Sequence, residues 1–242
     1  YEKSKQVELM REIYKRASRV LVHLGDLGDI DKAASVRANI RKLSMFFGAL
    51  DPQWRGTMID YWYKDQVDTP EWNALVRFLS HPWFSRVWVV QEVAVAPSVE
   101  IIVGDNYLPW LLADSAIRYL YEASLLKTQQ GQSRYAVDNA GHFCAMIAVR
   151  ERLQRGEMPR LSELLSQFQD FDATDPRDKV FALMGISDAA LDPLLPIDYN
   201  IDLVSLVCRT ARFLVSRGQY FETIHAAGTG WRRPREDVPT WV

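Results

Sequence analysis

The spacing of hydrophobic residues changes within the first 26 positions of the chain. Residues 6–17 carry apolar side chains at every third or fourth position with charged residues between them, which predicts an amphipathic helix. Residues 19–26 are almost continuously apolar, are partly β-branched and end in Gly-Asp, which predicts a buried strand followed by a turn. A helix leading into a buried strand indicates an α/β layer.

Similar patterns predict further elements up to residue 109. A second helix begins after Asp29 or Asp31, and a third begins at Thr69-Pro70, where a hydroxyl cap precedes Pro at the first helical position. Residues 83–97 are apolar almost throughout, so periodicity alone does not separate helix from strand, but their length favours a helix. Residues 99–105 are short, β-branched and closed by Gly-Asp, which predicts a second strand.

Helical patterns dominate beyond Pro109, where strand signals become rare. The predicted helices cover residues 110–126, 141–155, 161–168, 179–184 and 203–217. Two stretches lack a clean period. Residues 54–68 are predicted to be irregular, and residues 127–139, which are polar and contain Gly131, are predicted to form a mobile loop.

The composition is that of a soluble globular protein and argues against strongly electrostatic partners. The 242 residues are 48% hydrophobic and 25% charged, and 29 basic against 31 acidic residues give a formal net charge of -2. No global positive field therefore exists to hold nucleic acid or an anionic membrane. We expect no nucleic acid partner and no membrane span, because no apolar run approaches the roughly 18 to 20 residues that a span needs.

The cysteines and the chain ends bear on compartment and extent. Cys144 and Cys208 have neither CxxC spacing nor a neighbouring His at a ligand offset, which favours a reducing compartment and predicts a cytoplasmic protein. The chain begins at Tyr1 without Met and without a signal peptide, and we expect it to be a piece of a longer polypeptide.

Glu92 is the most unusual charge in the sequence, because the other strongly polar residues of its apolar run are Arg86 and Gln91. A carboxylate there must be paired, protonated or used in chemistry. If the run is helical, Ser85, Trp88 and Glu92 share one face, and the indole leaves the acid partly desolvated. The alternative is that Glu92 pairs with Arg86 or another cation and fixes the packing of the helix.

Each other candidate residue has a structural alternative. Trp83 and Trp88 belong either to the core or to the wall of a ligand site. Arg177 and Asp178 lie in a segment that helix start and stop signals explain, or they reach into a site. The four histidines are isolated, so we expect no metal site, and no GxSxG, P-loop or GxGxxG motif occurs.

Residues 83–93 read WFSRVWVVQEV and strongly resemble the W-x-x-R-x-W-x-x-Q-E block of the fungal heterokaryon incompatibility (HET) domain. Residues 6–14 (QVELMREIY) resemble that family's Q-V-x-x-M-x-x-I-Y helix, and residues 20–25 (VLVHLG) resemble its V-x-V-W-L-G strand, with His23 at the aromatic position. Further blocks that resemble the segments following this domain are residues 175–185, 197–199 and 238–242. The family's opening strand and its W-I-D-x-x-C-I-N-Q block would lie upstream of Tyr1, and we expect them to be missing from this chain.

The resemblance implies an α/β fold with a TIR-like (Toll/interleukin-receptor-like, flavodoxin-like) core. This core is a parallel sheet that is incomplete at its amino end, followed by a mainly α-helical carboxyl-terminal extension. Residues 1–108 would be the later part of the domain, and residues 109–242 the helical extension packed on it. The resemblance also implies a role in nonself recognition and programmed cell death in filamentous fungi.

Some TIR domains cleave NAD with a glutamate on a helix that carries a W-C-x-x-E pattern. Glu92 lies at a comparable place between the two predicted strands, four residues after Trp88. The resemblance therefore implies an NAD(P) glycohydrolase in which Glu92 stabilises an oxocarbenium-like charge and Arg86 orients it or meets a phosphate. Trp83 and Trp88 would form apolar walls, and the supporting candidates are Gln91, Arg177 and Asp178.

The competing interpretation is a noncatalytic death-signalling module that works by self-association or partner binding. NAD or NADP is the substrate in the enzyme hypothesis, and no bound cofactor is expected. The other expected partners are further copies of the chain and an unidentified fungal protein. A cleft beside Glu92 would separate the two hypotheses, because a glutamate without one cannot act on a dinucleotide.

Overall fold

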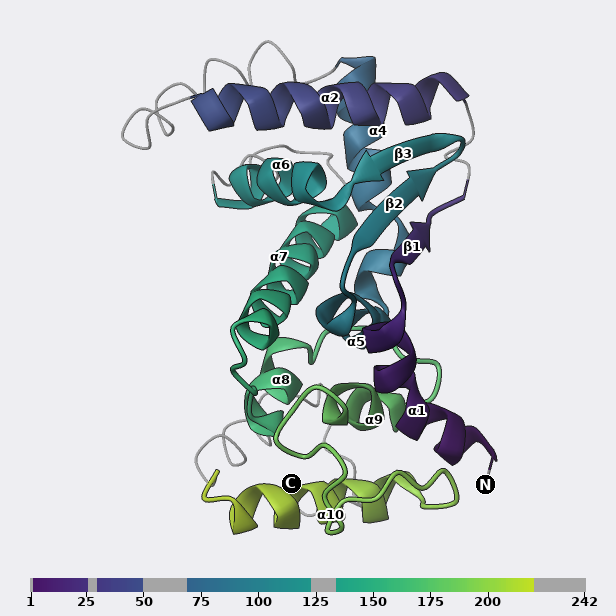
Figure 1. The fold of residues 1–242 in the computed structure, drawn as a ribbon, viewed down its shortest axis with the longest axis vertical. Coiled ribbons are helices and arrows are strands. Elements are labelled where there is room, and N and C mark those ends of the chain that lie inside the picture. Colours follow the sequence, from purple (N-terminus) through teal and green to yellow (C-terminus); the bar gives the residue numbers. More distant parts are fainter. Residues whose placement is uncertain (1, 26–29, 50–68, 123–133, 220–242) are drawn as a thin grey trace. The chain divides into compact units, whose positions relative to one another are not determined.

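A computed structural model of the chain describes residues 2–25, 30–49, 69–122 and 134–219. Its elements, drawn in Figure 1, fall into two units. The Glu92 unit takes in Tyr1–Ala17, Ser85–Ala96 and Ala148–Val242, and the sheet unit takes in Ser18–Phe84 and Pro97–Ile147. Both units draw on segments from either side of residue 108, and the predicted division into 1–108 and 109–242 stays a prediction.

In its described residues, the sheet unit contains three strands and the helices that pack around them. Its elements are β1 (Val20–His23), β2 (Val99–Val103), β3 (Asn106–Pro109), α2 (Ile30–Ala49), α4 (Pro70–Leu79), α6 (Trp110–Glu122) and the first part of α7 (Arg134–Gln154). β1 pairs in parallel with β2, and β2 turns back antiparallel into β3. The protein is therefore mixed α/β, with a small mixed sheet among mostly helices.

The sheet confirms both predicted strands and adds one that the sequence patterns missed. Val20 lies opposite Val99 in the parallel pair, and Val103 lies opposite Asn106 in the hairpin. Gly104 turns the hairpin at φ 53°, a left-handed conformation that suits glycine. Because β3 is antiparallel to β2, the expectation of a purely parallel sheet is wrong.

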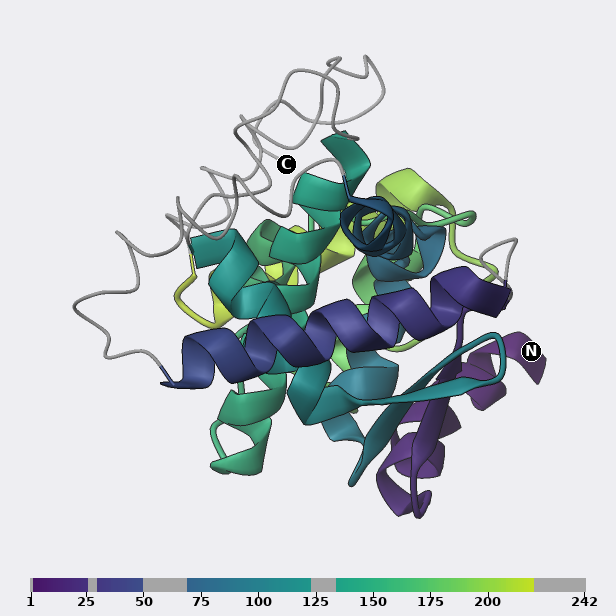
Figure 2. The ribbon, with the colours of Figure 1, turned by 90° about the horizontal axis from the view of Figure 1, so that it is seen from above.

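The longest helix of the sheet unit, α2, packs on α4, α6 and β3. Figure 2 shows α2 lying across these elements with α4 seen end-on. The fully buried apolar side chains of α2 in its described part recur at helical spacing: Val36, Ile40 and Leu43. α4 begins as predicted, because the Thr69 hydroxyl accepts a hydrogen bond from the Trp72 N–H at 3.2 Å and Pro70 is the first helical residue.

The predicted mobile loop at residues 127–139 is wrong over its last six residues, which are the start of α7. Ala136 and Ala140 are fully buried one turn apart, so this polar stretch has an apolar stripe. Asn139 is also buried, and its amide donates to the carbonyls of Leu79 at 2.7 Å and His81 at 3.3 Å. Residues 123–133 lie outside the described residues, as do Asp29, the irregular segment 54–68 and the block 238–242.

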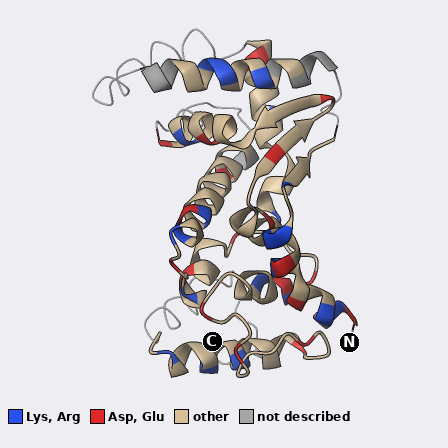
Figure 3. Cartoon of the chain, in the orientation of Figure 1, with Lys and Arg blue, Asp and Glu red and all other residues tan. Residues whose placement is uncertain are grey.

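The Glu92 unit is helical in its described residues. Its helices are α1 (Glu2–Arg16), α5 (Val87–Val95), α8 (Leu161–Gln167), α9 (Asp178–Met184), α10 (Leu203–Ser216) and the last part of α7. α5 lies in contact with α1 and α9, and α8 with α9. Figure 3 shows basic and acidic residues interspersed along α1, in keeping with the near-neutral net charge.

Residues 83–97 do not form one continuous helix. A 3-10 turn covers Pro82–Ser85, Arg86 is extended at φ -75° and ψ 127°, and α5 begins at Val87. The cause is a backbone bridge to Asp172, whose carbonyl accepts from the Val87 N–H at 3.0 Å and whose N–H donates to the Ser85 carbonyl at 2.6 Å. This pairing holds Arg86 outside the helix.

None of the helices in the described ranges combines the length and the hydropathy that a membrane span requires. Both cysteines, Cys144 and Cys208, are free thiols.

Candidate functional site

The helix that carries Glu92 is fixed at both ends. At its start, the Ser85 hydroxyl donates to the Asp172 carboxylate at 2.7 Å beside the backbone bridge. At its end, the buried guanidinium of Arg150 donates to the carbonyl oxygens of Val93 and Ala96, each at 2.5 Å. The carbonyl oxygens at the end of a helix have no hydrogen-bond donors inside the helix, and Arg150 of α7 provides donors for two of them.

Glu92 meets Tyr14 of α1. The Tyr14 hydroxyl donates a hydrogen bond to the half-buried Glu92 carboxylate. Burial raises the pKa of Glu92 above its ordinary value of 4.5, while the Tyr14 hydrogen bond and the positive charge of Arg86 act in the opposite direction. Burial, together with the negative charge of Glu92 and the hydrogen bond to it, raises the pKa of Tyr14 to about 12.

The face of α5 around Glu92 differs in one respect from the sequence expectation. Trp88 lies one turn before Glu92 on the same helix, as expected, and is half-buried. Ser85 does not share this face, because it precedes α5 and bonds to Asp172. Arg86 is exposed and acts on both Tyr14 and Glu92 through its charge.

Gln91 is one of the residues that line a cavity of about 240 Å³. The polar wall of this cavity comes mainly from α1, with Glu8 and Arg11 among its residues, and the apolar wall comes from α9 and residues 190–197. Gln91 is 1% exposed, and its Oε1 lies 2.8 Å from the position that a Cβ on Gly185 would take. Among the described residues, Glu92 is not part of the lining of this cavity, so the cavity is not the cleft beside Glu92 that would favour the enzyme hypothesis.

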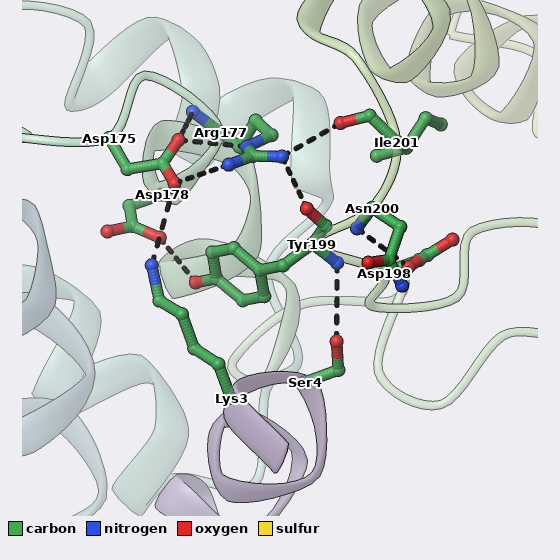
Figure 4. Close-up of polar contacts among 9 residues, drawn as sticks. All are labelled: Lys3, Ser4, Asp175, Arg177, Asp178, Asp198, Tyr199, Asn200 and Ile201. Carbon is green, nitrogen blue, oxygen red and sulfur yellow. Dashed lines mark hydrogen bonds and ion pairs between the residues drawn. The ribbon is translucent and has the colours of Figure 1, made fainter. Parts of the chain in front are cut away.

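Arg177 and Asp178 build a polar network around Tyr199 (Figure 4). The Arg177 guanidinium bonds to both carboxylate oxygens of Asp175, at 3.0 and 2.8 Å, and to the carbonyls of Tyr199 and Ile201, at 2.6 and 2.9 Å. The Tyr199 hydroxyl donates to the buried carboxylate of Asp178. The hydrogen bonds from Arg177 lower the pKa of Asp175 to about 2. These contacts fit the structural alternative, in which the segment organises its own turn.

Trp83 belongs to the sheet unit, whereas Glu92, Arg86 and Trp88 belong to the other unit. Its indole is 8% exposed and packs edge-to-face on Phe84, with 5.2 Å between ring centroids. These contacts are those of a core residue. Its assignment to a ligand wall stays a prediction, as do the roles assigned to Gln91, Arg177 and Asp178.

Two residues of this site are invisible to sequence patterns. Tyr14 counts there only as an apolar position of an amphipathic helix, and Arg150 is one of several charges on a predicted helix. The available signal for Tyr14 was its place in the block 6–14, which resembles a family helix. In the part of the chain that the structure describes, no group of three or more His, Cys, Asp and Glu side chains could hold a metal ion.

Comparisons with known proteins agree with the sequence resemblance. Residues 1–92 match the family model described as "Heterokaryon incompatibility protein (HET)". The whole chain aligns with 42% of the length of "Heterokaryon incompatibility protein 6, OR allele" from Neurospora crassa, at 23% identity over 293 aligned positions. The chain thus spans less than half of this curated relative. No solved structure matches the chain.

Proposed function

Since the chain is a HET domain protein, we propose that it acts in heterokaryon incompatibility as an effector of programmed cell death that hydrolyses NAD or NADP. The family points to heterokaryon incompatibility. The enzymatic activity, the TIR-like nature of the core and a cytoplasmic location are parts of the proposal. A TIR-like core is supported by the order of elements, in which α5 lies between the parallel strands β1 and β2 along the sequence.

The proposed reaction breaks the bond between C1′ of the ribose and the nicotinamide nitrogen. The electron pair of that bond goes to the nicotinamide ring, which leaves neutral, and positive charge develops on the ribose. A water oxygen then bonds to C1′ and releases a proton. A fixed carboxylate can stabilise the developing charge or hold a ribose hydroxyl, and this is the role proposed for Glu92.

The observation that carries this proposal is the setting of Glu92. Its carboxylate is half-buried on a helix fixed at both ends, and its partner is the neutral hydroxyl of Tyr14. An acid whose pKa is raised by burial and which has a specific partner is a candidate functional group. Arg86, the residue before this helix, is exposed, so a phosphate of the substrate could bind its guanidinium at the surface.

The test uses the whole protein with NAD and with NADP and follows release of nicotinamide. Glu92→Gln removes the negative charge at nearly constant shape and should abolish release, whereas the matched control Glu122→Gln, on α6 of the sheet unit, should leave it unchanged. If a folded wild-type protein at high concentration releases no nicotinamide, the enzymatic proposal is wrong. Release that survives Glu92→Gln would overturn the residue assignment alone.

A noncatalytic module remains the second candidate function because of an apolar surface on α1. Leu9 and Ile13 lie one turn apart on this helix and are 58% and 61% exposed. Such a pair favours self-association of the chain or binding of a protein partner. If cell killing survives Glu92→Gln but is lost in Leu9→Asp/Ile13→Asp, signalling depends on assembly and not on hydrolysis.

A further inference from the structure

The amino end of α1 is held by a polar contact that we call the clasp, made by Lys3 and Ser4 with Asp175 and Tyr199. The Lys3 ammonium lies 3.5 Å from an Asp175 carboxylate oxygen and 3.8 Å from the centre of the Tyr199 ring. The Ser4 hydroxyl accepts from the backbone N–H of Tyr199 at 3.2 Å. Figure 4 shows Lys3 and Ser4 reaching from α1 to this network.

Asp175 and Tyr199 are also held by residues outside α1. Arg177 holds the Asp175 carboxylate from two nitrogens and the carbonyl of Tyr199 from a third. Asp178 accepts a hydrogen bond from the hydroxyl of Tyr199, whose ring Lys3 covers. Asp175 and Tyr199 therefore present to Lys3 and Ser4 a surface of fixed geometry, made of one carboxylate, one ring face and one backbone N–H.

The other end of α1 carries Tyr14, which donates to Glu92. Ten residues of α-helix separate Ser4 from Tyr14 and span about 15 Å. Val7 is buried between the two ends, and α1 lies in contact with α5. A helix of this length moves as one body, so a shift or rotation at Ser4 displaces the Tyr14 hydroxyl as well.

We propose that the clasp positions Tyr14 against Glu92, which makes Lys3 and Ser4 positioning residues for the carboxylate at the far end of α1. Asp175 and Tyr199 come from the two sequence blocks 175–185 and 197–199, to which the proposed reaction assigns no step. The significance of the clasp for catalysis rests on the proposed function, but the mechanical coupling does not. Tyr14 and Arg86 both act on Glu92, and Tyr14 lies on the same helix as Lys3 and Ser4.

The experiment measures the pKa of Glu92 by carbon-13 NMR of labelled glutamate carboxyls, with the resonance assigned by its loss in Glu92→Gln. Tyr14→Phe removes the hydrogen bond that lowers this pKa, so it should raise the pKa of Glu92 in the wild-type background. In a Lys3→Met/Ser4→Ala background the same change should have no effect, because Tyr14 is no longer held in place. Lys42→Met, on the exposed face of α2 in the sheet unit, serves as the matched background in which the effect should persist.

An equal effect of Tyr14→Phe with and without the clasp would overturn the proposal. So would the absence of any effect in the wild-type background. Lys3→Arg, with Ser4 intact, keeps a cation beside Asp175 and the Tyr199 ring. In this background Tyr14→Phe should again raise the pKa of Glu92, whereas a purely structural loss would not be rescued by the arginine. Circular dichroism of each variant verifies that α1 and the rest of the chain are folded.

If the protein hydrolyses NAD, both Lys3→Met/Ser4→Ala and Tyr14→Phe should lower kcat/KM. The variant that combines all three substitutions should lose no more kcat/KM than the more damaging of the two. Additive losses would contradict a shared route through Tyr14. If the protein releases no nicotinamide, the NMR measurement still decides whether the clasp positions Tyr14. Failure of the proposed function and failure of the clasp are therefore separate results.

Discussion

Arg150 provides the sharpest test of how the helix of Glu92 is held. Arg150 is 8% exposed, and its guanidinium donates to the carbonyl oxygens of Val93 and Ala96 at the end of α5. Burial lowers the pKa of Arg150, yet as an arginine it keeps its proton, so a charged group is buried here among carbonyl dipoles. We consider Arg150→Met, which keeps the length of the stem and removes the hydrogen-bond donors.

The expected cost follows from the groups left behind. Each buried carbonyl that loses its donor costs about 1–3 kcal/mol, and the favourable interaction of a cation with a helix carboxyl end contributes about 0.3–1 kcal/mol more. Relief of the desolvated guanidinium offsets part of this sum. The net loss of stability for Arg150→Met should be about 2–4 kcal/mol. Arg150→Lys keeps the charge but not the fork, so its loss should lie between that of Met and zero.

Urea unfolding followed by tryptophan fluorescence gives the loss, and amide hydrogen exchange locates it. The protection of the α5 amides near Val93 should fall more than that of the sheet amides near Ile101. A loss below about 1 kcal/mol would refute the reasoning. An equal loss of protection in both places would show that Arg150 supports the chain in general and not the end of α5.

Three further outcomes follow from the site. In Tyr14→Phe the pKa of Glu92 loses a lowering influence, so the acid limb of any NAD hydrolysis profile should move to higher pH, and an unmoved limb would contradict the contact. In Gly185→Ala the new Cβ would lie 2.8 Å from Oε1 of the buried Gln91, which should cost about 1–2 kcal/mol in a thermal melt; an unchanged Tm would show that the amide can move aside. Asp175, whose pKa is lowered to about 2, stabilises the fold above its unfolded pKa and loses this contribution as pH falls through 2. Between pH 5 and 2 the wild type should therefore lose about 1–2 kcal/mol more than Asp175→Asn in urea titrations, and parallel losses would argue against the ion pair.

Elements with strong local signals could be predicted from the sequence. The strands at residues 20–23 and 99–103 are apolar runs closed by Gly-Asp, and the helix at Pro70 has its cap written beside it. β3 was missed because only Leu108 of its four residues is buried, which leaves little alternation to detect. The sequence signal for β3 was Gly104 in the turn before it. This glycine indicates a hairpin only once β3 is known to pair with β2.

The candidate site could be predicted only in part, because its partners come from distant segments. Glu92 stands out by its apolar neighbours, which is a local property. Tyr14 does not, because a tyrosine on an amphipathic helix has the same pattern whether it covers a core or donates to a carboxylate. The break at Arg86 was also hidden, since an apolar run predicts a continuous helix until the bridge to Asp172 is known.

The pairing of Glu92 with Tyr14 bears on why this carboxylate is present at all. A side chain selected only for packing would gain most from a directly bonded cation or from being neutral, and Glu92 has a neutral donor and a distributed positive charge instead. Because its folded pKa lies above the unfolded value, ionised Glu92 opposes folding: stability gained by the protonated form is present below the unfolded pKa and is lost as pH rises through the folded pKa. The fold therefore carries a carboxyl group whose ionised form weakens it, on a helix that Arg150 and the Asp172 bridge hold in place. A destabilising group on a well-supported element is the arrangement expected of a functional residue, and it favours chemistry over packing as the reason for Glu92.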